Sequence, residues 1–227
     1  MKFRSVFMTL SCAFALAACG GQDGSASVQA GSAAAEVPAG SVKVQTAHGE
    51  AVVPQNPERV AVYDLGAVDT LSKLGVKIGA PVDSQNLAYL DAPLKDAVKA
   101  GTLFEPNYEA LNAYNPQLIV IGSRMAKDKV SDELAKLAPT IDMTAQTDNM
   151  KESAKARIDA YGRIFGKQTE ADALKAEIDK TFADAKAAAQ GKGKGLVILV
   201  NAGKLSAFGP DSRLGGWIHR DIGVPAA

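Results

Sequence analysis

Two arginines stand where the sequence could bring fixed positive charge to a ligand. Arg124 follows the apolar run at residues 118–121 after two small residues, and Arg213 follows the run at residues 204–208 within the segment Gly-Pro-Asp-Ser-Arg. An arginine stays charged in proteins, offers a planar fork of donors to oxygen atoms and stacks on aromatic rings. Ligands of parallel sheets lie beyond the carboxyl ends of the strands. The two positions therefore favour contact with an anionic ligand.

Few other side chains could bind a ligand or a metal or take part in a reaction. Tyr63 ends the apolar run at residues 59–63, and a phenolate is a hard oxygen donor suited to Fe(III), although a structural tyrosine is the alternative. His48 falls in a predicted turn and is expected to be solvated. The sequence has no His/Asp/Glu cluster typical of a Zn or Mn site, no Gly-x-Ser-x-Gly elbow, no Ser/His/Asp set and no phosphate loop. It therefore predicts a binding protein and not an enzyme, with no metal site of its own.

The N-terminus has the three parts of an export signal. Lys2 and Arg4 precede an apolar stretch at residues 6–17, which is too short to span a bilayer and ends in Leu-Ala-Ala-Cys at residues 16–19. Small residues suit a peptidase that binds the chain extended, and the thiol of Cys19 can be acylated. The pattern resembles the lipobox of bacterial lipoproteins. It predicts a signal peptide at residues 1–18 and a lipid anchor at Cys19 that holds the protein to a bacterial membrane in the periplasm.

The charge of the processed chain limits its partners. Removing residues 1–18 lowers Lys+Arg from 25 to 23 against 25 Asp+Glu, which leaves a net charge of about −2 and no basic block. Nucleic acid is therefore excluded as a partner. Cys19 is then the single cysteine, so no disulfide is expected. Residues 19–40 are rich in Ser, Ala and Gly and predict a flexible lipidated tether.

Short apolar runs alternate with helical patterns after the tether. A hairpin is predicted at residues 42–53. The predicted strands are residues 59–63, 76–80, 118–121 and 140–142. The predicted helices are residues 65–74, 92–100, 108–114 and 127–137. This alternation indicates a mostly parallel sheet covered by helices, and it defines an N-terminal α/β lobe at residues 41–149.

The pattern changes after residue 149. Helices are predicted at residues 150–165 and 169–189, the second with apolar residues spaced three and four apart, so that residues 150–190 form a helical segment. Residues 191–227 then begin a second α/β lobe, with strands at residues 196–200 and 204–208. The first of these strands is continuously apolar, like a strand covered on both faces. Only residues 204–208 and about 217–222 are available to cover it, so part of its apolar surface is expected to stay exposed.

Several ordered blocks carry a family resemblance. They are Asn-Pro-Glu-Arg-Val at residues 56–60, GTLFEPNYEALNAYNPQLIVIGSR at 101–124, Ala-Pro-Thr-Ile-Asp at 138–142, Ile-Phe-Gly-Lys at 164–167 and AFGPDSRLG at 207–215. The sequence is similar to periplasmic binding proteins for ferric siderophores, and most to those for catecholates such as ferric enterobactin. The resemblance implies two α/β lobes joined by one long helix. Family members continue beyond the equivalent of Ala227, so the second lobe is expected to be incomplete.

The resemblance also implies a role for individual residues. Arg124 and Arg213 match binding arginines of the two lobes, and Glu109 matches an acidic residue that pairs with an arginine of the membrane permease. The expected ligand is a ferric catecholate siderophore with no intrinsic cofactor, and the expected partner is the permease of an ABC-type iron importer. A monomer is expected.

Three alternatives stay open. The same fold could bind haem, cobalamin or a hydroxamate siderophore, although paired arginines favour an anionic catecholate and argue against cobalamin. An exported enzyme on an α/β scaffold is a second alternative. The third is an inactive truncated remnant, in which residues 195–227 are less protected than the first lobe because apolar strand edges are exposed.

Overall fold

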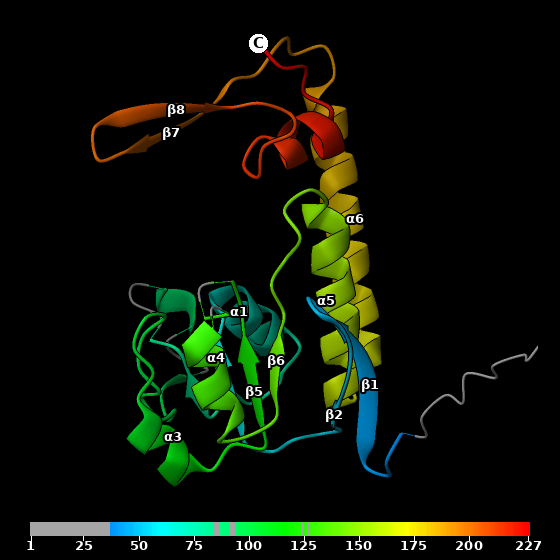
Figure 1. The fold of residues 1–227 in the computed structure, drawn as a ribbon. Helices are drawn as coiled ribbons and strands as arrows, with labels where there is room; N and C mark the ends of the chain where they lie inside the picture. Colours follow the sequence, from blue (N-terminus) through cyan, green and yellow to red (C-terminus); the bar gives the residue numbers. More distant parts are fainter. Residues whose placement is uncertain (1–36, 84–86, 91–93, 124, 127) are drawn as a thin grey trace, which may run out of the picture. The chain divides into compact units, whose positions relative to one another are not determined.

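A four-stranded parallel sheet forms the centre of the fold (Figure 1). The computed structural model describes residues 37–83, 87–90, 94–123, 125–126 and 128–227. The strands, in the order β4-β3-β5-β6, are β3 (Val60–Tyr63), β4 (Ala80–Pro81), β5 (Leu118–Ile121) and β6 (Thr140–Asp142). All residues of β3 and β5 are buried, as expected for parallel strands covered on both faces. The predicted α/β class is confirmed.

Helices connect and cover these strands. They are α1 (Leu65–Lys73), the 3-10 turn η1 (Ala88–Leu90), α3 (Tyr108–Tyr114) and α4 (Asp128–Ala135). The face of α1 formed by Ala67, Val68 and Leu71 is fully buried, and the helix packs beside β3. α3 ends at Asn115, whose left-handed backbone (φ 52°) stops the helix before Pro116. The predicted α3 agrees with the structure residue for residue.

The helix predicted at residues 92–100 is wrong for residues 95–100, whereas Leu94 is helical. The amide of Ala97 donates to the carbonyl of Leu94 in a single turn (3.0 Å), but that of Val98 donates to Gly79 (2.8 Å). The amide of Val98 is thus used by chain next to β4. The strand predicted at residues 76–80 correspondingly contracts to Ala80–Pro81.

The predicted hairpin is present before the sheet. It consists of β1 (Ser41–Thr46) and β2 (Gly49–Pro54), which pair antiparallel. Val44 and Val53 are buried, so one face of the hairpin joins the core. Its turn reaches the end of β6, where the amide of Ala47 donates to the carbonyl of Asp142 (2.9 Å).

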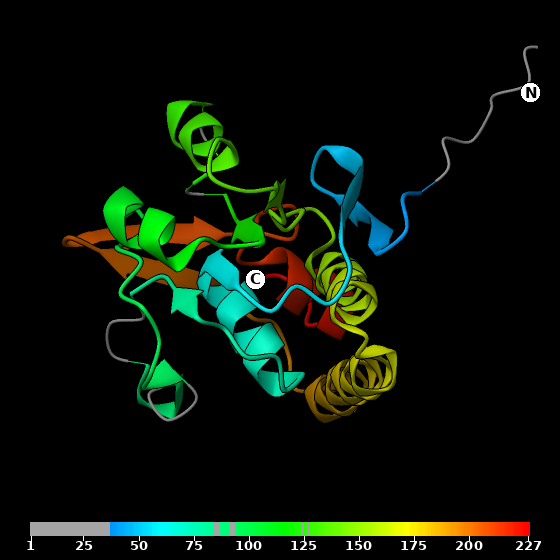
Figure 2. The same cartoon turned by 90° about the horizontal axis from the view of Figure 1, so that it is seen from below.

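Two long helices follow the sheet and lie side by side (Figures 1 and 2). They are α5 (Met150–Phe165) and α6 (Gln168–Ala189). α5 ends at Gly166, whose left-handed backbone (φ 62°) lets the chain reverse into α6. Along α6 Ala171 is the buried residue, while Leu174 and Ile178 are partly buried. Apolar burial therefore explains α5 better than α6.

The last elements are a hairpin and a single π-helical turn. β7 (Val197–Asn201) pairs antiparallel with β8 (Lys204–Phe208), and η2 (Trp217–Ile222) follows. The side chains of β7 are largely exposed, and Val200 is 67% exposed, which agrees with the expectation that part of the apolar run at residues 196–200 stays uncovered. None of the described helices has both the length and the apolar character needed to cross a bilayer.

Candidate ligand-binding site

A small pocket opens at the carboxyl ends of β3 and β5. It has a volume of about 160 Å³ and is called here the β3–β5 pocket; its lining consists of Tyr63, Asp64, Leu65, Gly66, Leu103, Gly122 and Ser123. The residues after two neighbouring parallel strands supply most of this lining, which is the place where α/β sheets bind ligands. The pocket therefore agrees with the position predicted for a ligand.

Asp64 is the charged residue of this pocket. Its carboxylate caps α1 by accepting from the amide of Ala67 (2.6 Å), and the same oxygen pairs with Nη2 of Arg157 on α5 (2.7 Å). The other carboxylate oxygen lies against Gly122, where an added Cβ would be 2.1 Å from it. Only glycine therefore fits at the end of β5 while Asp64 keeps this position.

Arg157, which pairs with Asp64, and Tyr161 lie one helical turn apart on α5. Burial alone would lower the pKa of Arg157, but the nearby Tyr161 and Asp64 raise it above its usual value, so the guanidinium stays charged. Burial raises the pKa of Tyr161 to about 12, against the opposing influence of Arg157. Within the described chain, the hydroxyl of Tyr161 and Nε of Arg157 are buried without a hydrogen-bond partner.

The predicted ligand residues differ in how the structure places them. Arg124 lies outside the described residues, but Ser123, which precedes it, lines the β3–β5 pocket. Arg213 is exposed in the loop between β8 and η2. Tyr63 is fully buried, and its hydroxyl donates to the carbonyl of Ala100. Burial raises the pKa of Tyr63, which favours the neutral phenol over an iron-binding phenolate.

The other candidates lie on the surface or in the core. Glu109 is exposed in the first turn of α3, and its neighbour Tyr108 is 38% exposed. His48 is not simply solvated as expected, because its Nε2 pairs with Oδ2 of the buried Asp142 (2.9 Å). The ring of His219 is buried, with Nδ1 2.8 Å from the carbonyl oxygen of Val224. In the described part of the chain, no three His, Cys, Asp or Glu side chains form a group that could hold a metal.

A larger pocket lies after β4 and was not predicted from the sequence. It has a volume of about 560 Å³ and includes Asp83, Lys95, Lys99, Thr102 and Asn107 in its lining. The sequence pattern predicts a helix at residues 92–100 and does not indicate Lys95 or Lys99 as ligand contacts. Its two lysines add positive charge on a second segment that follows a sheet strand.

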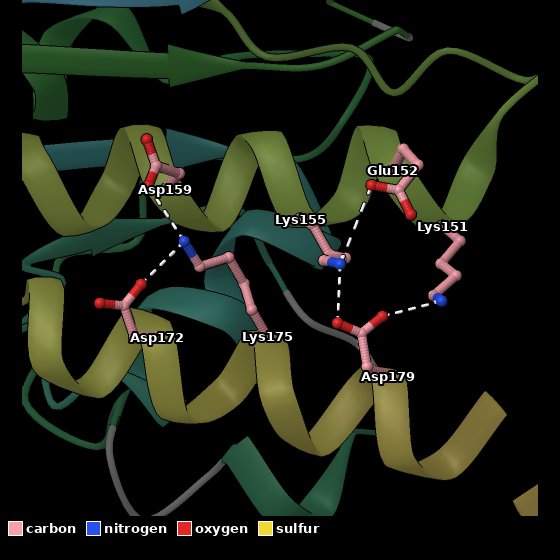
Figure 3. A network of polar contacts seen from close by, with 7 residues as sticks. All are labelled: Lys151, Glu152, Lys155, Asp159, Asp172, Lys175 and Asp179. Atoms are coloured by element: carbon pink, nitrogen blue, oxygen red, sulfur yellow. Dashed lines mark hydrogen bonds and ion pairs between the residues drawn. The ribbon is translucent and has the colours of Figure 1, made fainter. Parts of the chain in front are cut away.

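Ion pairs join α5 to α6 in what we call the α5–α6 ladder (Figure 3). Asp179 of α6 accepts from Lys151 (2.8 Å) and Lys155 (2.7 Å) of α5, and Lys175 of α6 donates to Asp159 of α5 (3.1 Å). Hydrogen bonds from the two lysines lower the pKa of Asp179. These ion pairs add to the apolar contacts that Ala171, Leu174 and Ile178 make along α6.

The end of the ladder contacts η2 through aromatic rings. Nζ of Lys151 lies 5.3 Å from the ring centre of Phe182, and that ring meets Trp217 edge to face at 6.5 Å. Trp217 is the only tryptophan of the chain. It is the first residue of η2 and lies four residues after Arg213 in the sequence. The loop that carries Arg213 is therefore followed directly by a contact with α6.

Comparison with known proteins identifies the family. A model for periplasmic binding proteins matches residues 60–227, which is most of the chain. The chain belongs to the periplasmic binding protein family. Its place there confirms the α/β binding-protein fold and supports a substrate-binding role over an enzymatic one.

Two proteins named for the ferric siderophore or siderophore they bind are similar to this chain. The petrobactin-binding protein YclQ of Bacillus subtilis is 38% identical over 230 residues, covering 100% of this chain and 70% of YclQ. The ferric-anguibactin-binding protein FatB of Vibrio anguillarum is 33% identical over 186 residues, which cover 79% of this chain and 57% of FatB. The chain thus spans only part of the length of these relatives.

A solved structure supports the same relationship. The crystal structure of VctP from Vibrio cholerae, described as a periplasmic catecholate-siderophore binding protein, superposes with a TM-score of 0.73 at 29% identity. The superposition covers 82% of this chain and 67% of VctP.

Proposed function

We propose that this family member is the substrate-binding component of an ABC-type iron importer and that it captures a ferric siderophore. The observation that carries the proposal is the alignment of the whole chain with the petrobactin-binding protein YclQ. The β3–β5 pocket supports it, because it lies at the carboxyl ends of parallel strands where such a ligand would bind. No intrinsic cofactor takes part; the ferric siderophore is the cargo.

The proposed ligand class is a ferric catecholate such as ferric enterobactin. A ferric tris-catecholate is a trianion with aromatic faces, and arginine suits both features. Arg124, next to Ser123 of the pocket, and the exposed Arg213 are the proposed contacts. Tyr63 is proposed as part of the pocket lining, with its hydroxyl held by Ala100. The name of VctP, a catecholate binder at 29% identity, supports this class.

The proposed cellular setting combines a lipid anchor at the N-terminus with a contact to the membrane permease. Cys19 is the proposed lipid anchor after removal of residues 1–18, and residues 19–40 are the tether. The exposed Glu109 on α3 is the proposed contact with an arginine of the permease. The proposed domains are an N-terminal lobe at residues 41–149, a helical segment at 150–190 and the beginning of a second lobe at 191–227.

The test is a titration of the lipid-free protein with ferric enterobactin, ferric petrobactin, a ferric hydroxamate, haem and cobalamin. Intrinsic fluorescence from Trp217 reports binding, because it is the single tryptophan. We expect saturable quenching by the ferric catecholates at lower concentrations than by the other ligands. Tighter binding of haem, cobalamin or the hydroxamate would overturn the ligand class, and no binding of any ligand would favour the inactive remnant.

A further inference from the structure

The β3–β5 pocket has a carboxylate in its lining, which an anionic ligand would not favour. Asp64 lines this pocket, and its side chain is 21% exposed. A like charge beside a ligand reduces its affinity, and the effect is stronger where water is partly excluded. A binding site for a ferric tris-catecholate therefore has to compensate Asp64.

The Asp64 side chain has a structural role, and that role holds its carboxylate in the pocket. One carboxylate oxygen of Asp64 accepts from the amide of Ala67 and so caps α1. The second oxygen is packed against Gly122. The side chain is thus fixed in the pocket by its role in the fold.

Arg157 supplies the compensating charge from a different element. Its Nη2 is 2.7 Å from the Asp64 oxygen that caps α1, and its side chain is only 17% exposed. Nearby Tyr161 and Asp64 raise the pKa of Arg157 despite burial, so the guanidinium carries its charge throughout the physiological range. Among the groups that the structure describes, Asp64 is the carboxylate that pairs with Arg157.

We infer that Arg157 is a positioning residue for ligand binding: it neutralises Asp64 in the β3–β5 pocket, and so allows an anionic ferric siderophore to bind there. This inference rests on the proposed function and adds a residue to it. Arg157 acts through Asp64. Its effect on affinity should therefore depend on the presence of the Asp64 charge.

Three variants test this dependence, with ferric enterobactin as the ligand and Trp217 fluorescence as the readout. Arg157→Gln leaves Asp64 unpaired and should weaken binding about tenfold at low ionic strength. Asp64→Asn keeps a side chain that caps helices well but removes the charge, so it should tighten binding by a few-fold. The double variant should return to within about threefold of the unaltered chain.

Salt and a matched arginine separate electrostatics from folding. The differences between variants should shrink from about 20 mM to about 500 mM salt, because screening becomes stronger. Arg163→Gln is the control: Arg163 lies on the same helix and pairs with Asp159 (2.9 Å), and it is absent from the lining of the β3–β5 pocket. It should leave affinity unchanged. Thermal unfolding of each variant shows whether it is folded.

Several outcomes would overturn the inference. Equal affinity of Arg157→Gln and the unaltered chain would do so, as would weaker binding by Asp64→Asn or no recovery in the double variant. If Arg157→Gln alone does not fold, the double variant is compared with Asp64→Asn. Loss of Arg157 should weaken binding by much less than about tenfold when residue 64 carries no charge, and a tenfold or larger loss there would overturn the inference. Failure of the unaltered chain to bind ferric enterobactin contradicts the proposed ligand, and the inference with it.

Discussion

Replacing Gly122 by alanine tests the packing behind the pocket most directly. A Cβ at this position would lie 2.1 Å from Oδ2 and 2.8 Å from Cγ of Asp64, far inside van der Waals contact. Gly122 follows the buried strand β5, so the backbone has little freedom to move away. Asp64 must therefore shift, and it would lose its alignment with both the amide of Ala67 and Arg157.

The cost can be estimated from these contacts. Overpacking a close-packed site costs about 1–3 kcal/mol, and a lost helix cap adds about 1 kcal/mol. The side chains of Asp64 and Arg157 remain partly exposed, so we add little for their ion pair. Gly122→Ala should therefore lower the free energy of unfolding by roughly 2–4 kcal/mol.

Urea unfolding followed by circular dichroism measures this loss, and a double-mutant cycle assigns it. In an Asp64→Ala background the nearest remaining atom of residue 64 is its Cβ, 3.0 Å away, so Gly122→Ala should cost less than about 1 kcal/mol. Gly209→Ala is the control, because no atom lies within 4 Å of the added Cβ, and its effect should stay within about 0.5 kcal/mol. Equal costs of Gly122→Ala in both backgrounds would refute the reasoning.

Three further predictions concern the ladder, the ligand and the anchor. Because Lys151 and Lys155 lower the pKa of Asp179, its carboxylate stabilises the fold above the unfolded value near 3.8, and this contribution is lost as the pH falls through the lower folded pKa. The unfolding temperature of the unaltered chain should thus exceed that of Asp179→Asn at pH 6, and the difference should shrink as the pH falls below 3.8; a constant difference would contradict this. Arg124→Ala, made in a full-length relative, should weaken ferric catecholate binding by a few kcal/mol, and unchanged affinity at matched ionic strength would exclude Arg124 from the site. Cys19→Ala should release or misprocess the protein; a variant of mature mass still in the membrane fraction would argue against lipidation.

Several helices and strands could be predicted from the sequence because residues next to them in the chain determine where they begin and end. α3 begins after an asparagine cap and ends at Asn115 before Pro116, and α5 ends at Gly166, so the ends of these helices follow from neighbouring residues. The apolar run of β5 indicated a strand buried on both faces, and it is one. Such features need no knowledge of distant contacts.

The features that the sequence did not predict depend on contacts between residues far apart in the chain. The segment at residues 94–100 follows its hydrogen bond from Val98 to Gly79, which no helical pattern reveals. The apolar run of β7 indicated a strand, but its composition does not specify that β8 pairs with it or how far its faces are covered.

The candidate site also contains residues that the local sequence indicates and residues that it does not. Arg124 and Arg213 could be proposed from the sequence because each follows a predicted strand within a block of family resemblance, and their roles stay predictions. Arg157 was missed because its partner Asp64 is 93 residues away in sequence. Aspartate after a strand and before a helix does predict a cap, and that signal could have found Asp64. No local feature of α5 indicates that one of its arginines faces that cap.

The order of charges in the α5–α6 ladder also specifies how the two helices align. In the observed register Lys155 faces Asp179 and Asp159 faces Lys175. A slip of about one turn in one direction would oppose Lys155 to Lys175, and a slip in the other direction would oppose Asp159 to Asp179. The first slip would keep Lys151 opposite Asp179 but would bring Lys155 against Lys175, and the second would bring two carboxylates together. The charge order of α5 and α6 therefore favours the observed register over its two neighbours.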